Sequence, residues 1–331
     1  MKGKVLDMFQ LLDEIKDAKT VGISGHIRPD GDCVGSVLAV YMYVKKMMPE
    51  TKVEAFLETP SDIFSCIKDF KEINTSFEKK TGNPDEPFDV FIVLDCEKTR
   101  IGAAESLFDA AKKTINIDHH ISNAHGCGDV NYIAPEASST SELVFDVMDE
   151  SALDEDIAKS IYIGIIHDTG VFQYSNTSPK TLQIAAKLVG FGFDFPALID
   201  STFYEKTYVQ NQILGRALME SILFMDGQCI VSVIDKKTMD FFGATPKDLE
   251  GIVSQLRFTK GVECAIFMYE VGTQQFKVSL RSCGKVNVAQ VAEFFGGGGH
   301  VRAAGCIVNG SFYDVVNNMS LYIEKQLLEQ K

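Results

Sequence analysis

Short apolar segments that alternate with helical patterns occupy the first 190 residues, and this alternation constrains the fold more than any other feature. Strand-like runs fall at 20–24, 53–57, 88–94 and 115–117. Helical patterns fall at 31–48, 103–111, 139–149, 155–166 and 179–189. Because parallel strands need long crossover connections, which are usually helices, the pattern predicts an α/β fold with a parallel sheet and helices on both faces.

The rest of the chain follows a different pattern. Strands are expected at 228–234, 263–269 and 276–281, and helices at 246–256, 288–295 and 313–328. This order is typical of a smaller mixed α/β domain. We therefore expect a catalytic, metal-binding domain over 1–190, a helical connection over 191–225 and a second domain over 226–331. An amphipathic helix is expected at the start of the chain, from the spacing of Val5, Met8, Phe9, Leu12 and Ile15.

Charge limits the partners that the chain can bind. The sequence holds 32 Lys and Arg residues against 46 Asp and Glu residues, a formal net charge of −14. Residues 226–331 contain equal numbers of acidic and basic residues, so residues 1–225 carry the whole net negative charge. No basic stripe is visible, which disfavours binding to long duplex nucleic acid and to acidic membranes. A small anionic substrate remains compatible with this charge if cations are bound in the acidic part.

Cysteine usage and hydropathy indicate the compartment. None of the eight cysteines forms a CxxC pair, so a zinc ribbon or a thioredoxin-like motif is excluded. The acidic N-terminal segment is unlike a secretory signal. No apolar run approaches the roughly 18–20 residues needed to cross a membrane. We expect a cytoplasmic protein with reduced thiols and no membrane partner.

Histidine and aspartate gather where the predicted strands end. His26, Asp30 and Asp32 follow the first strand, and Asp95 ends the strand at 88–94. Asp118-His119-His120 and His167-Asp168 close two further apolar runs. Each group alone could be a polar cap, and Asp32 could simply cap the helix that follows. Four groups of this composition favour a cation site, because neighbouring carboxylates repel one another unless a cation or proton lies between them.

The residue types indicate which metal. Imidazole and carboxylate ligands suit Mn²⁺, Mg²⁺ or Co²⁺ better than thiolate-bound zinc. The candidate ligands outnumber what one ion needs, so two ions are expected. A shared carboxylate would hold two ions about 3.5–4 Å apart, the spacing that activates a water and clamps a phosphoryl group.

A glycine run marks the second domain. Four successive glycines precede His300, and Arg281 lies upstream. Backbone N–H groups of such a run can approach an anion closely, and an Arg fork suits phosphate. The alternative is a flexible hinge.

Together these residues resemble the motifs of DHH phosphoesterases. The matching positions, in the expected order, are His26, Asp30 and Asp32, then Asp95, then Asp118-His119-His120, then Asp168. The glycine run with Arg281 is similar to the DHH-associated C-terminal domain. The resemblance is strongest to the NrnA-type group, described as oligoribonucleases that act on nanoRNA and as phosphatases of 3′-phosphoadenosine 5′-phosphate (pAp).

The resemblance implies a role for each matching residue. His26 and Asp30 would bind one Mn²⁺, Asp32, His119 and Asp168 would bind the other, and Asp95 would bridge both. Asp95 and His120 would be catalytic, His120 donating to the scissile phosphate, while Asp118 orients a histidine. Residues of the second domain would bind substrate across an interdomain cleft: Arg281, Ser282, Gly298, Gly299 and His300. His125 and His167 match no ligand and are expected to be structural.

The implied function is hydrolysis of short oligoribonucleotides to mononucleotides, of pAp to AMP, or of both, by attack of a water activated by two metal ions. The expected partners are short RNA or a small nucleotide, with a homodimer possible. Three alternatives stay open: a phosphodiesterase for linear or cyclic dinucleotides such as pApA and c-di-AMP, a pyrophosphatase or exopolyphosphatase, and a non-catalytic nucleotide sensor. A long-strand exonuclease of the RecJ type is disfavoured because no additional nucleic-acid-binding domain fits in 331 residues.

Overall fold

The computed structural model describes residues 10–329. Residues 1–9 and 330–331 lie outside the described part, and with them Val5, Met8 and Phe9 of the expected first helix. The described part of that helix is α1, Leu11–Ile15. The chain divides into two compact units, the first ending at Glu205 and the second beginning at Lys206. The segment 191–225 is therefore shared between the two units.

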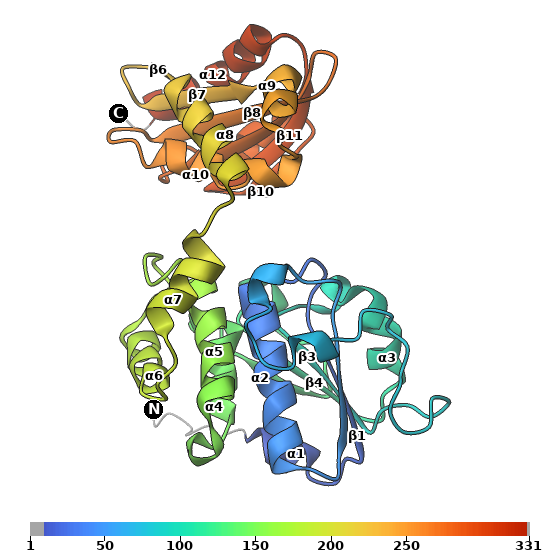
Figure 1. The fold of residues 1–331 in the computed structure, drawn as a ribbon. Helices are drawn as coiled ribbons and strands as arrows, with labels where there is room; N and C mark the ends of the chain where they lie inside the picture. The colour runs from blue at the N-terminus through green and yellow to red at the C-terminus, as the bar shows by residue number, and fades with distance from the viewer. Residues whose placement is uncertain (1–9, 330–331) are drawn as a thin grey trace, which may run out of the picture. The chain divides into compact units, whose positions relative to one another are not determined.

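A five-stranded sheet forms the centre of the first unit (Figure 1). Its order is β2-β1-β3-β4-β5, and every pairing is parallel. This confirms the parallel sheet expected from the alternating pattern. The strands are β1 Thr20–Ser24, β2 Lys52–Phe56, β3 Val90–Leu94, β4 Thr114–Asp118 and β5 Val130–Ile133.

Both faces of this sheet are buried. In β3, Ile92 and Leu94 belong to one apolar core, while the intervening Phe91 and Val93 belong to another. Because successive strand residues point to opposite faces, the two cores lie on the two sides of the sheet. One side is covered by the layer containing α2, α4, α5 and α6, and the other by α3 (Figure 1). These helices are α2 Gly31–Met47, α3 Glu105–Ala110, α4 Thr140–Val147, α5 Glu155–Asp168 and α6 Pro179–Val189.

Side-chain caps fix where the helices of the first unit begin. The Asp30 carboxylate accepts from the backbone N–H groups of Asp32 and Cys33, both at 3.1 Å, and so caps α2. Ser139 caps α4, and Ser178 and Thr181 form a capping box on α6. The unit closes with α7, Phe195–Ile199, and a π-helical turn, Asp200–Tyr204. Short 3₁₀ turns lie at Asp62–Phe64, Phe70–Glu72, Lys98–Arg100, Gly102–Ala104, Ile121–Asn123 and Glu150–Ala152.

The strand order creates a switch point at the carboxyl edge of the sheet. The chain runs from β1 outward to β2 and returns to β3 on the other side of β1. Loops that follow β1 and β3 therefore leave in opposite directions. In open α/β sheets, ligands bind at such a switch point.

The second unit contains a six-stranded mixed sheet in the order β10-β11-β9-β8-β7-β6. Only β7 and β8 pair in parallel. Alternate residues of β7 and β8 contribute to two cores, one on each face of the sheet. The strands are β6 Ile222–Phe224, β7 Cys229–Ile234, β8 Cys264–Gly272, β9 Gln275–Ser282, β10 Gly298–His300 and β11 Ala303–Asn309. The helices are α8 Tyr208–Met219, α9 Lys236–Phe242, α10 Ile252–Arg257, α11 Val288–Phe294 and α12 Phe312–Leu328, with a 3₁₀ turn at Pro246–Leu249.

Two details of this unit differ from the sequence expectations. The helix expected over 246–256 is interrupted, because Gly251 adopts a φ of 84° and separates the 3₁₀ turn from α10. The end of the glycine run is a strand rather than a hinge, since Gly298–His300 pair antiparallel with 303–305 of β11. Among residues 10–329, no helix is long and apolar enough to span a membrane.

Candidate metal centre

The strand topology brings three of the sequence groups to one edge of the first sheet. His26 lies two residues beyond β1, Asp95 directly follows β3, and Asp118 is the last residue of β4. These three strands are neighbours and parallel, so their carboxyl ends meet. Asp30 and Asp32 arrive at the same edge on the first turn of α2, and Asp168 arrives at the end of α5.

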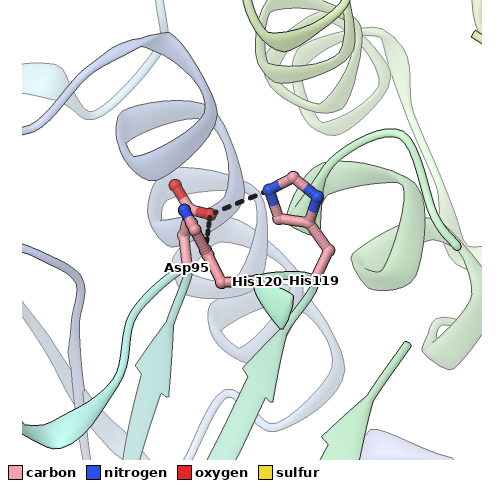
Figure 2. A group of neighbouring side chains, drawn as sticks. All are labelled: Asp95, His119 and His120. Atoms are coloured by element: carbon pink, nitrogen blue, oxygen red, sulfur yellow. Dashed lines mark ion pairs between the residues drawn. The ribbon is translucent and has the colours of Figure 1, made fainter. Parts of the chain in front are cut away.

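Asp95 is the centre of the cluster. Its side chain is only 3% exposed, and three imidazoles surround it. His26 Nε2 lies 3.4 Å from Asp95 Oδ2, whereas His119 Nε2 and His120 Nδ1 each lie 3.6 Å from Oδ1 (Figure 2). The Asp95 backbone has a φ of 61°, in the left-handed region that non-glycine residues seldom occupy. Such backbone strain gathers at functional sites, where the surrounding structure enforces it.

Potential ligand atoms converge in three overlapping groups, each within 4.8 Å. The first is His26, Asp30 and Asp95, and the second is Asp32, His119 and Asp168. The third joins Asp95 to His119 and His120. The structure thus brings together every side chain of the first unit that the sequence singled out as a ligand. Asp95 belongs to the first and third groups, and His119 belongs to the second and third. The three groups therefore form one continuous cluster.

The N-terminus of α4 holds Asp32 and Asp95. The two oxygens of Asp32 accept the backbone N–H groups of Thr140 at 2.6 Å and Ser141 at 2.9 Å. The Thr140 hydroxyl donates to Asp95 Oδ1 at 3.0 Å. Asp32 therefore does not cap its own helix, a function that Asp30 performs. Thr140 was not singled out from the sequence, where it reads only as part of a polar segment that begins a helix.

Asn176 holds the candidate ligand Asp168 at the end of α5. Asp168 Oδ2 lies 3.5 Å from His119 Nε2, across the second group. The Asn176 amide donates to the backbone oxygens of Asp168 at 3.1 Å and Ser138 at 2.8 Å. It thereby ties the end of α5 to the segment that precedes α4. Asn176 was not singled out from the sequence, where it stands in a run of turn-forming residues that carries no information about this distant partner.

Asp118 fixes the orientation of His120. Its Oδ1 accepts from His120 Nδ1 at 2.7 Å, and its Oδ2 accepts from the Asn123 amide at 2.7 Å. Asp118 is fully buried. The hydrogen bond to Asp118 raises the pKa of His120, against the opposing effect of burial. His120 therefore uses Nδ1 on Asp118, and its Nε2 is the nitrogen left for another partner.

The electrostatics of the cluster fit a divalent cation. Burial and repulsion from Asp95 and Asp168 raise the pKa of Asp32 well above its usual value, and burial raises the pKa of Asp168 to about 6. Burial alone would lower the pKa of His26, but its contacts with Asp30 and Asp95 raise it to about 10. The carboxylates thus repel one another at a site that is largely withdrawn from water, and a cation placed between them would relieve this repulsion. Oxygen and imidazole donors in this setting are the ligand set of Mg²⁺, Mn²⁺ and related ions.

The two remaining histidines near these motifs lie outside the ligand groups. The His167 ring packs between Phe64, 5.0 Å away between ring centroids, and Phe203, 5.4 Å away. It also lies against Gly31, where a Cβ atom would be 2.2 Å from His167 Cγ. Its pKa is lowered to about 4 by burial. His125 is exposed on the loop that follows β4.

The residues expected to bind substrate gather at one side of the second sheet. Arg281 pairs with Ala303 across β9 and β11, and Gly298, Gly299 and His300 form the exposed edge strand β10. Gly299 has a φ of 148°, and a Cβ there would lie 2.5 Å from the Ala303 oxygen, so only glycine fits. Ser282 is buried, and its hydroxyl donates to the Val301 carbonyl at 3.4 Å.

Comparison with protein families identifies both units. Residues 20–165 match the model of the DHH family N-terminal domain, and residues 226–326 match that of the DHHA1 domain. The protein belongs to the DHH family. The candidate metal centre lies in its DHH domain, and the glycine-rich strand lies in its DHHA1 domain.

Curated relatives cover nearly the whole chain. The bifunctional oligoribonuclease and PAP phosphatase NrnA of Thermus thermophilus is 28% identical over 87% of this chain and 84% of its own length. The protein of the same name from Bacillus subtilis is 27% identical, over 93% of both chains. A probable NrnA of Streptococcus mutans is 28% identical, over 96% of this chain and 98% of its own.

Solved structures agree with this assignment. An exopolyphosphatase-related protein from Bacteroides fragilis superposes with a TM-score of 0.83 at 26% identity, covering 96% of each chain. The exonuclease RecJ bound to manganese superposes with a TM-score of 0.54 at 12% identity, covering 95% of this chain and 92% of the other. The second likeness extends to the fold alone.

Proposed function

We propose that this protein is a metal-dependent phosphoesterase that hydrolyses short oligoribonucleotides to mononucleotides, pAp to AMP, or both. The observation that carries the proposal is the position of Asp95, whose two oxygens face different imidazoles inside a buried cluster of ligand atoms. The relatives named oligoribonuclease and PAP phosphatase support the substrate class. Substrates of this kind also fit the cytoplasmic location that we propose.

The proposed ligand assignment follows the ligand groups. His26 and Asp30 would hold one divalent ion, and Asp32, His119 and Asp168 would hold a second, with Asp95 contributing to both. We propose Mn²⁺, since imidazole and carboxylate donors suit it, with Mg²⁺ and Co²⁺ as alternatives. Bound ions of this kind would supply Lewis-acid activation of a water and neutralise charge on the phosphoryl oxygens.

The chain's own residues would position the substrate and donate to it. His120 would present Nε2 to a phosphoryl oxygen, because Asp118 engages the other ring nitrogen. The α4 N-terminus would keep Asp32 and Asp95 in place through the Thr140 and Ser141 contacts. Such prearranged groups stabilise the developing charge without having to reorganise during the reaction.

We further propose that the DHHA1 domain binds the part of the substrate away from the reacting phosphate. Arg281, His300 and the exposed backbone of Gly298 and Gly299 would make these contacts. Ser282 would act less directly, since its hydroxyl is turned toward the Val301 carbonyl. Exposure of the edge strand β10 supports this assignment.

Two other substrate classes use the same chemistry. Linear or cyclic dinucleotides differ from short RNA mainly in the ends that must be accommodated. Pyrophosphate and polyphosphate are suggested by the exopolyphosphatase-related protein of similar fold. A non-catalytic nucleotide sensor is disfavoured, because each ligand position of the DHH motifs holds a ligand residue.

A substrate panel tests the proposal. The full chain with added Mn²⁺ is assayed on pAp, on RNAs of two to ten nucleotides, on pApA, c-di-AMP, pyrophosphate and polyphosphate. We expect release of mononucleotides from the shortest RNAs, of phosphate from pAp, or of both. Asp95→Asn should abolish turnover, whereas Asp240→Asn, which alters an exposed carboxylate in α9, should leave it unchanged. No Mn²⁺-dependent turnover of any compound would refute the proposed function.

A further inference from the structure

Arg100 is a half-buried arginine that has no carboxylate partner in the described part of the chain. It ends the 3₁₀ turn Lys98–Arg100, five residues after Asp95. Among residues 10–329, no acidic side chain lies within ion-pairing distance of its guanidinium, and the guanidinium makes no hydrogen bond. This is unusual in a unit with a large acidic excess, because arginines withdrawn from water are normally paired. The free donors indicate a binding partner that is not part of the chain.

Contacts on both sides fix the segment that carries Arg100. Its backbone oxygen accepts from the Ile27 N–H at 2.8 Å, which attaches it to the loop of the first motif. Gly102 packs so closely on Ile27 that a Cβ atom would lie 2.4 Å from Ile27 Cγ2. On the other side, the Cys96 oxygen accepts from the amides of Asn116 and Asn123, beside the third motif. Arg100 is thus built into the rim of the candidate metal centre.

Arg100 is connected to two parts of that centre. Its backbone oxygen bonds to Ile27, the neighbour of His26, and its turn begins three residues after Asp95. The neighbouring groups on its own turn are already engaged. Glu97 accepts from the Thr99 hydroxyl at 3.1 Å, and Lys98 pairs with Asp109 at 2.6 Å. Arg100 is therefore the cation of this turn that remains available.

We propose that Arg100 is a catalytic residue that binds non-bridging oxygens of the reacting phosphate, beside His120. This rests on the proposed phosphoesterase function and adds to it a third source of positive charge. A planar guanidinium can donate two parallel hydrogen bonds to phosphate, which an ammonium group cannot reproduce. Because the segment is anchored by its backbone, the position from which the side chain extends is fixed before substrate arrives.

Two nearby cations serve as matched controls. Arg28, on the loop that Arg100 contacts, is exposed, and Lys98 lies on the same turn as Arg100 but points to Asp109. Arg28→Gln, Lys98→Gln and Arg100→Gln each remove one positive charge from the same edge of the domain. If the positive charges only attract an anionic substrate, turnover should fall similarly in all three variants. If Arg100 contacts the phosphate directly, turnover should fall in Arg100→Gln alone.

The experiment measures turnover and phosphate binding. At saturating Mn²⁺, kcat is determined on the best substrate of the panel for the wild type, Arg100→Gln, Arg100→Lys and both controls. Titration calorimetry of each protein then measures binding of Mn²⁺, and binding of inorganic phosphate to the Mn²⁺-loaded chain. We expect Arg100→Gln to lower kcat about 100-fold or more and to weaken phosphate binding about tenfold, with partial rescue by Arg100→Lys. Mn²⁺ binding, and both controls, should stay within about twofold of the wild type.

Two results would overturn the inference: full turnover by Arg100→Gln, or equal losses in Arg100→Gln and the two controls. Failure of the proposed function is distinguishable, because the wild type would then turn over nothing. In that case the phosphate titration decides alone, and unchanged binding in Arg100→Gln would refute the role of Arg100.

Discussion

The Nδ1 atom of His120 lies 2.7 Å from Oδ1 of Asp118, a buried carboxylate at the end of β4. The two residues are separated by one position in sequence, and Asn123 holds the other oxygen of Asp118. This pair engages Nδ1 of His120 and leaves Nε2 for another partner. Carboxylates that orient a histidine in this way are typical of metal and acid–base sites.

Replacement of Asp118 by Asn should therefore impair turnover. An amide can present its N–H to Nδ1, which favours the other tautomer and removes the negative charge that supports a protonated ring. We expect Asp118→Asn to lower kcat by about 10- to 100-fold or more, with a smaller effect on Mn²⁺ affinity. Steady-state kinetics at saturating Mn²⁺ measure this, and an unchanged kcat would show that the orientation of His120 is unimportant.

Thr140 offers a second test, because its hydroxyl donates to buried Asp95. Thr140→Val keeps the shape but leaves that carboxylate oxygen without its donor, which should cost about 1–3 kcal/mol of unfolding free energy and reduce turnover. Thr177 is the matched control, since its hydroxyl is buried without a partner in the described structure. Thr177→Val should be neutral or stabilising. Urea denaturation of both variants decides, and equal losses would contradict the assigned role of Thr140.

The clustering of the candidate ligand residues at one edge of the sheet could be predicted from the sequence, because it follows from local signals. Apolar runs that end in Asp95 and Asp118 identify strand ends, and parallel neighbours must bring those ends together. The predicted helices at 31–48 and 155–166 closely match α2 and α5. The resemblance of the motifs to DHH phosphoesterases is confirmed by the family match.

Other parts depend on contacts between distant segments, which periodicity does not encode. Thr140 reaches Asp95 across 45 positions of the chain, and Asn176 reaches Ser138 across 38. Strand β10 consists of Gly298, Gly299 and His300, whose composition has little β propensity, so only pairing with β11 makes it a strand. Gly251 interrupts a helix because of its backbone conformation, which an apolar pattern cannot reveal.

Gly31 sets the spacing between α2 and α5. An alanine Cβ at this position would lie 2.2 Å from Cγ of His167, next to Asp168. Gly31→Ala should cost about 1–3 kcal/mol and weaken Mn²⁺ binding, because the turn that carries Asp30 and Asp32 must move. Gly215→Ala is the control, since no atom lies within 4 Å of its Cβ position in α8, and it should stabilise by about 0.5–1 kcal/mol. Thermal unfolding and Mn²⁺ titration of both variants check this, and wild-type behaviour of Gly31→Ala would contradict it.

Stability at acid pH should depend on Asp89, the residue immediately before β3. Its ion pair with Lys112, 2.7 Å long, and the backbone N–H groups of Lys19 and Thr20 lower its pKa to about 2. Since the folded-state pKa is below the unfolded-state value, this stabilisation is fully present above about pH 4 and is lost as the pH falls toward 2. Asp89→Ala should therefore lower the unfolding free energy by about 1–2 kcal/mol at pH 7, without changing turnover. Urea titrations at pH 7 and pH 3 should show the difference shrinking, and a constant difference would exclude this linkage.

The claim that two divalent ions share Asp95 is tested most directly by calorimetric titration of the full chain with Mn²⁺. Two ions per chain are expected, and Asp95→Asn should weaken the binding of both. Binding should also release protons, because His26, with a pKa of about 10, must become neutral to act as a ligand. Titrations in buffers of different ionisation enthalpy would reveal that release. A stoichiometry of one ion, or two-ion binding that is unaffected by Asp95→Asn, would contradict the account.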